Sequence, residues 1–212
     1  MSLIQQTFEE KIFPAFAKVC EKSPQRLTER LFNDFEVYDV SLEDSENYGY
    51  AIIYWHKVIQ HKIEVYKAGC ELADMLKDFG LAFSNFALNS RLQVHDFSKF
   101  SCQETMGCVG KYIKGDDSQA ATIAYKQAWH HHKHHNDHHA EYWFDVKKSG
   151  VALPMQMPVI CIVEMVADWI GAGQTYGTPF KEWVKDNLDT FNFHEQTKVT
   201  LDRILEIYFA NV

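Results

Sequence analysis

The sequence has no uncharged apolar run of the roughly eighteen residues that a membrane-spanning helix needs. Its first residues, MSLIQQTFEEKIF, carry acids where a signal peptide would have a basic start followed by an apolar stretch. We therefore expect a protein with neither a membrane span nor a targeting segment. A chain of 212 residues that is 46% hydrophobic can bury one sizeable core, and we expect one domain.

The sequence also lacks C-x-x-C motifs and clusters of basic residues. The five cysteines form no C-x-x-C pair and lie mostly among apolar neighbours, as expected for buried thiols in a reducing compartment, so we expect a cytoplasmic protein. The formal net charge is −8 without any Lys/Arg cluster, which argues against a surface that follows the phosphates of duplex nucleic acid. A small phosphorylated ligand stays compatible with this charge, and homo-oligomerisation is left open.

Proline and glycine are few, and apolar residues recur at steps of three and four, so we predict a nearly all-α fold. We divide the single domain into N-terminal helices and an acidic loop (1–49), a metal-binding core (50–175) and C-terminal helices (176–212). The pattern predicts helices over 3–20, 25–35, 50–79, 84–97, 118–135, 139–147 and 158–171, one that opens at Thr178-Pro179, and one over 195–209.

The predicted helix 50–79 has two apolar stripes, so we expect it to be central in its domain. One stripe is Ile52-Ile59-Ile63-Tyr66-Cys70-Ala73, and the other is Tyr54-Val58-His61-Val65-Ala68-Leu72. His61 is the one histidine in these stripes. It is either a core histidine that bonds to a carbonyl or carboxylate group, or a metal ligand.

In the stretch QVHDFSKF, the adjacent residues His95 and Asp96 end a predicted helix. Neighbouring histidine and aspartate can both reach one divalent ion where the backbone bends at a helix end. Lys99 follows three residues later, where it could contact a phosphate as a point charge or bond to the last carbonyls of helix 84–97.

The stretch IVEMVADW places Glu164 and Asp168 at i and i+4, on one face of an otherwise apolar helix. A buried carboxylate without a partner costs several kcal/mol, so each should meet a cation, a metal or strong donors. The alternative is a helix face that opens to solvent.

Seven of the eleven histidines lie in AWHHHKHHNDHHAEYW, residues 128–143. The run is internal and interrupted, which excludes a purification tag, but a solvated low-complexity tract is a real alternative. Against that alternative, the apolar seam Ala121-Tyr125-Ala128 continues at steps of three and four residues into His132 and His135. We therefore expect both imidazoles to project from the core-facing side of the helix. His138 and His139 follow a predicted turn at Asn136-Asp137.

Taken in order, His61, His95-Asp96, the histidines of 131–139 and Asp168 resemble the HD-domain superfamily of metal-dependent phosphohydrolases. "HDFSK" looks like that superfamily's H-D-[IL]-[GS]-K variant, and "VADW" resembles its closing helix. More closely, "HDFSK", "HHKHHNDHH" and "EMVADW" together resemble an uncharacterised family of bacterial, phage and large-virus proteins, over roughly residues 55–185. This second resemblance carries no established activity.

The resemblance to the superfamily implies an all-helical, HD-domain-like bundle with one or two divalent ions at its centre. Mixed nitrogen and oxygen ligands without cysteine favour Mn²⁺, Fe²⁺, Zn²⁺ or another late first-row ion. The first ion would be held by His61, His95, Asp96 and Asp168. Asp96 would bridge to a second ion, held by histidines such as His132 and His138.

The implied activity is hydrolysis of a small phosphorylated molecule, most simply a nucleotide, by in-line attack of an activated water. Lys99 would contact the phosphate, His131 or His139 would bind it or shuttle a proton, and Glu164 would orient a ligand or a water. Two alternatives stay open. One is a non-catalytic protein that sequesters a nucleotide or metal, and the other is a helical interaction module with a solvated histidine loop.

Overall fold

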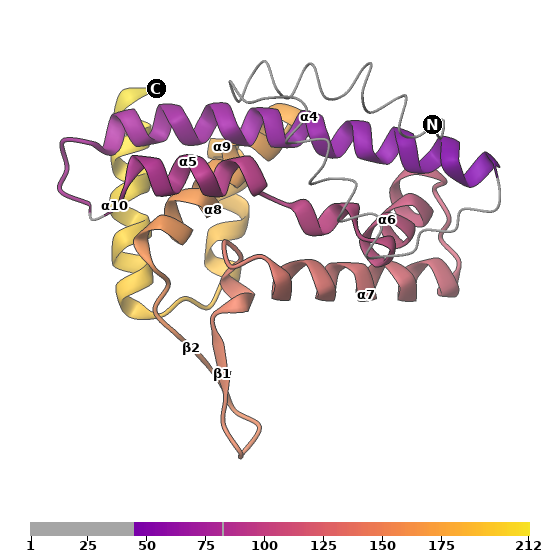
Figure 1. Ribbon diagram of the computed structural model, residues 1–212. Helices are drawn as coiled ribbons and strands as arrows, with labels where there is room; N and C mark the ends of the chain where they lie inside the picture. Colours follow the sequence, from indigo (N-terminus) through magenta and orange to yellow (C-terminus); the bar gives the residue numbers. More distant parts are fainter. Residues whose placement is uncertain (1–44, 82) are drawn as a thin grey trace. The chain divides into compact units, whose positions relative to one another are not determined.

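The computed structural model describes residues 45–81 and 83–212 (Figure 1). The predicted helices 3–20 and 25–35 lie outside the described residues, as does the acidic loop up to residue 44. The described part is mostly helical, as predicted, with one small sheet. Its α-helices are α4 (Ser45–Leu76), α5 (Asn85–Val94), α6 (Cys102–Cys108), α7 (Gln119–His135), α8 (Val159–Tyr176), α9 (Phe180–Asn187) and α10 (Glu195–Asn211).

The chain divides into two compact units, and each is built from two separate stretches. In the described part, unit 1 contains residues 45–63 and 96–135, and unit 2 contains residues 64–95 and 136–212. Helix α4 supplies residues to both units, and the chain passes from unit 2 to unit 1 between His95 and Asp96. The expectation of a single domain stays a prediction.

In unit 1, α6 packs closely along α7. The approach depends on Gly107, where an added Cβ would lie only 2.6 Å from the Cβ of Ala128. The fully buried Trp55 of α4 donates a hydrogen bond from Nε1 to Thr105 Oγ1 at 3.0 Å. Helix α6 was not predicted from the sequence, although Ser101 caps it by accepting a bond from the backbone N–H of Glu104.

In unit 2, helix α8 is buried nearly all round and forms the centre of the hydrophobic core. Gly171, predicted as its C-cap, is an interior residue instead, and the helix continues to Tyr176. An added Cβ at Gly171 would lie 2.6 Å from the backbone nitrogen of Val65, so glycine is needed there for close packing. The helix ends at Gly177, whose φ of 83° suits a left-handed cap. No helix among the described residues is both long and apolar enough to span a bilayer.

The predicted helix 139–147 is wrong. A 3₁₀ turn covers only Ala140–Tyr142, and the chain then forms an antiparallel hairpin of β1 (Phe144–Val146) and β2 (Ala152–Pro154). The two strands extend away from α8 and α10 of the same unit (Figure 1). Gly150, with φ of 81°, closes the turn, and Val151 O accepts a bond from Lys147 N. Each strand has only three residues, which is too few for the alternation of apolar and polar residues to be distinguished from a helical pattern in the sequence.

The observed bounds of α4 differ from the predicted 50–79 at both ends. The helix begins at Ser45 and ends at Leu76, and the turn that follows includes Gly80 with φ of 69°. The stripe that contains His61 is buried throughout, as predicted. The other stripe is only partly buried from Ile59 to Ala73, and the side chain of Ile52 lies outside the described residues.

Candidate functional site

A sharp backbone bend separates His95 from Asp96, as the sequence predicted. Helix α5 ends at Val94, His95 has φ −45° and ψ 132°, and Asp96 is left-handed with φ 57°. Asp96 is the one non-glycine residue with positive φ in the described part of the chain. Aspartate tolerates this region better than most residues, and such conformations are concentrated at functional sites. The bend therefore marks Asp96 as a candidate site residue on backbone grounds alone.

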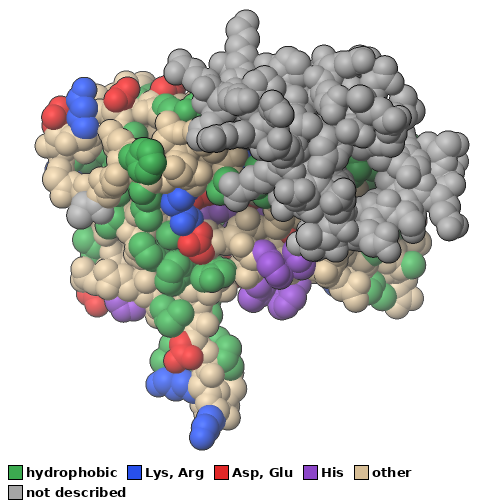
Figure 2. All heavy atoms as spheres, viewed as in Figure 1, with side chains coloured by type: hydrophobic (Ala, Val, Ile, Leu, Met, Phe, Trp, Pro, Cys, Tyr) green, Lys and Arg blue, Asp and Glu red, His purple; other side chains and the backbone are tan. Residues whose placement is uncertain are grey.

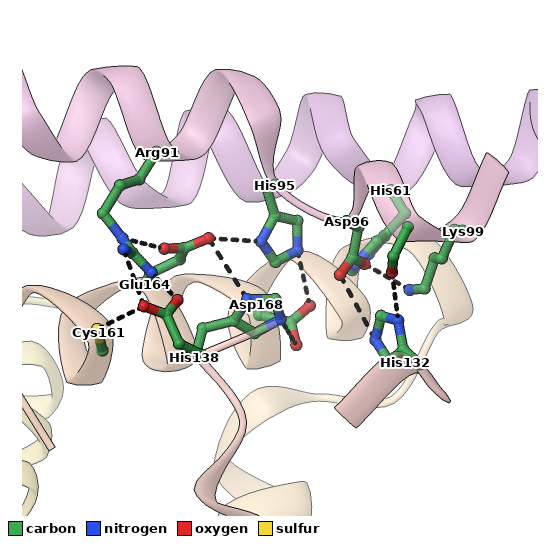
Figure 3. A network of polar contacts seen from close by, with 12 residues as sticks. His61, Arg91, His95, Asp96, Lys99, His132, His138, Cys161, Glu164 and Asp168 are labelled. Atoms are coloured by element: carbon green, nitrogen blue, oxygen red, sulfur yellow. Dashed lines mark hydrogen bonds and ion pairs between the residues drawn. The ribbon is translucent and has the colours of Figure 1, made fainter. Parts of the chain in front are cut away.

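The Asp96 carboxylate lies between two histidines of unit 1 (Figure 3). His61 Nε2 is 3.4 Å from Oδ2, and His132 Nε2 is 3.5 Å from Oδ1. All three side chains are buried. Both distances exceed those of a direct N–H···O hydrogen bond. They are close to the separation of about 3.0–3.4 Å between two ligands of one ion, which follows from bonds of about 2.1 Å at angles of roughly 90–110°.

Glu104 fixes the orientation of two histidines of α7. Its Oε2 accepts from His132 Nδ1 at 2.9 Å, and its Oε1 accepts from His131 Nδ1 at 2.6 Å. Because an ionised carboxylate only accepts hydrogen bonds, both Nδ1 atoms carry protons, and each neutral ring keeps its lone pair on Nε2. The Nε2 of His132 therefore presents a lone pair to Asp96, an arrangement that a cation would stabilise.

Glu104 was not predicted from the sequence as a site residue. It follows Ser101 in the S-x-x-E pattern of a capping box, in which the glutamate would bond back to the N-cap amide. Here its side chain bonds to His131 and His132 instead, at sequence separations of 27 and 28. The capping pattern could have predicted α6, but not the partners of this carboxylate.

Lys99 forms an ion pair with Asp96, with 2.5 Å between Nζ and Oδ2. Its side chain is 21% exposed, whereas that of Asp96 is only 1% exposed. The ammonium group therefore lies between the buried carboxylate and solvent. From there it can reach a ligand without itself binding a metal, because an ammonium group has no lone pair.

A second cluster, in unit 2, is centred on the buried carboxylate of Glu164 (Figure 3). Oε1 lies 3.0 Å from His95 Nδ1 and 3.4 Å from His138 Nδ1, and Oε2 accepts from Arg91 Nε at 2.6 Å. Burial raises the pKa of Glu164, but the hydrogen bonds from His138 and His95 outweigh burial and hold the pKa well below its usual value. Glu164 is thus held as an anion, and it keeps the Nδ1 protons of both histidines in place.

Asp168 lies one helical turn beyond Glu164, on the other side of the same two imidazoles. Its Oδ1 is 3.4 Å from His95 Nε2, and its Oδ2 is 3.9 Å from His138 Nε2. Carboxylate–imidazole–carboxylate arrays are the usual setting of a metal-ligating histidine, with one carboxylate as orienting group and the other on the metal side. The close set of His95, His138 and Glu164 could also hold an ion directly.

Arg91, like Glu104, was not predicted from the sequence as a site residue. It lies one turn before His95 on α5, so both can reach Glu164, and it also forms a two-pronged ion pair with Asp137. Burial lowers the pKa of Arg91, but the bond to Asp137 and the charge of Glu164 more than compensate, so the pKa is raised. The expectation that the buried Glu164 meets a cation or strong donors is therefore confirmed, with Arg91 as the cation. The i, i+4 spacing of Arg91 and His95 was the available signal.

The histidine run separates into buried and exposed positions. His132 is buried, as its seam predicted, whereas His135 is exposed, and its prediction as core-facing is wrong. The reason is that α6 begins at Cys102, and its first turn reaches only to His131 and His132 of α7. His138 is buried after the turn, and the half-buried ring of His139 packs on it at 4.4 Å.

The residues predicted from sequence thus fall into two groups, each brought together within its own unit. Unit 1 contains His61, Asp96, Lys99, His131 and His132. Unit 2 contains His95, His138, His139, Glu164 and Asp168. That His61 and Asp96 share one ion with His95 and Asp168 stays a prediction, as do the phosphate-binding or proton-transfer roles of His131 and His139.

The chain belongs to a family of unknown function, DUF5662, whose profile matches residues 52–207. The match includes every residue of both clusters, in agreement with the resemblance to an uncharacterised family. No curated protein and no solved structure matches the chain.

Proposed function

We propose that this protein is a metal-dependent phosphohydrolase that acts on a small phosphorylated molecule, such as a nucleotide. The observation that carries this proposal is the environment of Asp96. One of its oxygens faces His61, the other faces His132, and Lys99 lies on its exposed side. A carboxylate with a different histidine on each oxygen is suited to bridge two divalent ions.

The donor set fits a late first-row divalent ion. Imidazole nitrogen and carboxylate oxygen are the available ligands, and no cysteine lies among them, which distinguishes the cluster from a closed structural zinc site. Within unit 2, His95, His138 and Asp168 offer the same kinds of donor, and we predict that they supply further ligands. Mn²⁺, Fe²⁺ and Zn²⁺ all remain suitable.

Each residue of the cluster has a distinct part in this proposal. A divalent ion at Asp96 would lower the pKa of a bound water toward neutrality and offset charge on the phosphoryl oxygens. Glu104 keeps the proton on Nδ1 of His132, so that Nε2 is available as a ligand. Lys99 exchanges its ion pair with Asp96 for a phosphate oxygen and holds the substrate as a point charge. Glu164 orients His95 and His138 in the same way.

The test is release of phosphate or nucleoside monophosphate from a panel of mononucleotides, dinucleotides and cyclic dinucleotides with Mn²⁺. We expect turnover by the wild type and little by Asp168→Ala. Lys99→Ala should lose substrate binding or turnover but keep its metal. Lys111→Ala is the matched control. Lys111 also forms a 2.5 Å ion pair with an aspartate of unit 1, Asp117, but this pair lies at the surface.

The panel also separates hydrolysis from sequestration. A wild-type protein that binds metal and one panel member tightly, but releases no product, would overturn the hydrolase proposal in favour of a sequestering protein. Wild-type protein without any bound metal would overturn the hydrolase proposal.

A further inference from the structure

The proposed function does not require four of the histidines of α7 as ligands. His130, His134 and His135 are exposed, and His131 is half-buried. Figure 2 shows histidine side chains gathered in a surface patch, at the end of α7 in Figure 1. They form two pairs at i, i+4 spacing, His130 with His134 and His131 with His135. Two histidines at this spacing on one helical face are a known geometry for binding a divalent metal.

The rings of the His131–His135 pair lie closer together than those of the other pair. They are stacked, with centroids 3.7 Å apart and planes 17° apart. The two imidazoles therefore lie side by side on one helical face, at the i, i+4 spacing of known histidine pairs that bind a divalent metal. The rings of His130 and His134 are 4.2 Å apart and tilted by 37°.

Hydrogen bonds set the tautomer of both members of the first pair. His131 donates from Nδ1 to Glu104 Oε1 at 2.6 Å, and His135 donates from Nδ1 to the carbonyl oxygen of His131 at 2.7 Å. A carboxylate and a carbonyl oxygen only accept, so in each neutral ring the lone pair is on Nε2. In the other pair, His134 is fixed in the same way by His130 O, but His130 donates no side-chain hydrogen bond to any described residue.

We propose that His131 and His135 form a surface site for a late first-row divalent cation, with Glu104 as the orienting carboxylate behind His131. Two Nε2 lone pairs beside an anion attract a cation and offer no donor to a phosphate. In this proposal His131 therefore binds a metal, and it does not make the phosphate contact predicted from the sequence. Glu104 also bonds to His132 through its other oxygen, so one carboxylate orients both this surface pair and a ligand of the buried cluster.

The experiment is a titration of the metal-free full chain with Zn²⁺ alone, in competition with a chromophoric chelator. His135→Ala is compared with His134→Ala, because both residues are exposed, lie on the last turn of α7 and donate to the carbonyl four residues earlier. We expect His135→Ala to weaken one Zn²⁺ equivalent by more than about tenfold, because the second ligand of a chelating pair is lost. His134→Ala should bind like the wild type.

The same comparison in an Asp96→Asn background separates this site from the buried cluster. We expect the surface equivalent to persist there and to remain sensitive to His135→Ala alone. Equal binding by His135→Ala and wild type would overturn the proposal. Equal losses in His134→Ala and His135→Ala would also overturn it, because they would indicate diffuse binding by the whole histidine run. Both variants change exposed side chains, so matching thermal unfolding curves will confirm that the fold is intact.

Discussion

Arg91 Nε donates a 2.6 Å hydrogen bond to Glu164 Oε2, which joins α5 to α8 within unit 2. The same guanidinium group forms a two-pronged pair with Asp137, in the turn that precedes His138. Arg91 therefore positions both the carboxylate that orients His138 and the turn from which His138 projects.

Replacement of Arg91 by methionine should lower the free energy of unfolding by about 1–3 kcal/mol, because the buried Glu164 would lose a charged donor. Arg91→Lys should recover only part of this loss, since an ammonium group cannot bond to two carboxylates in the same forked geometry. Chemical denaturation measures both. Arg203→Met is the control, because Arg203 forms an exposed pair with Glu206 and should change stability by less than about 0.5 kcal/mol. Equal effects of the two methionine variants would contradict the structural role of Arg91.

Replacement of Glu104 by glutamine should weaken metal binding by about 10–100-fold, the usual effect of removing an orienting carboxylate. The amide would accept from one histidine but present a donor to the Nδ1–H of the other. ¹⁵N spectra of the imidazoles should therefore show a change of tautomer at His131 or His132. Gln103→Ala, at the adjacent and exposed position of α6, is the control. Unchanged tautomers together with unchanged affinity would remove Glu104 from the site.

We predict that the purified protein holds a late first-row divalent metal, and that replacement of Asp96 by asparagine removes most of it. Asparagine also tolerates the left-handed conformation, so the variant tests the charge of the side chain and not the backbone bend. Elemental analysis of protein purified without an affinity tag measures the metal. Asp117→Asn, at an aspartate whose side chain is 84% exposed, should retain wild-type content. Retention of the metal by Asp96→Asn would mean that Asp96 is not a ligand.

Replacement of Gly171 by alanine should destabilise the protein by about 1–3 kcal/mol despite the better helix propensity of alanine. The new Cβ would lie 2.6 Å from the backbone nitrogen of Val65, which cannot move aside as a flexible side chain could. Gly110→Ala is the control, because its Cβ would make an ordinary 3.8 Å contact with Ala121. Thermal unfolding of the two variants compares them directly. A Gly171→Ala protein as stable as wild type would show that α4 and α8 can separate at this point without cost.

Local patterns in the sequence were sufficient to predict most of the helices and the positions of several buried polar residues. The buried stripe of α4 contains His61, the seam of α7 leads to His132, and the bend at His95-Asp96 follows from a helix end. Each of these depends on the face that a residue occupies within its own helix. Helical periodicity determines that face, because successive residues are separated by a fixed rotation.

The tertiary structure alone decided which charged groups meet. Arg91 and Glu164 are 73 residues apart, and Glu104 and His131 are 27 apart, so no local pattern relates them. It also decided that His135 is exposed although its seam points inward, because α6 begins too late to cover it. Gly171 looked like a helix end and is a packing position against Val65. In each case the outcome depends on where a neighbouring element begins or how closely it approaches, and periodicity within one helix carries no information about its neighbours.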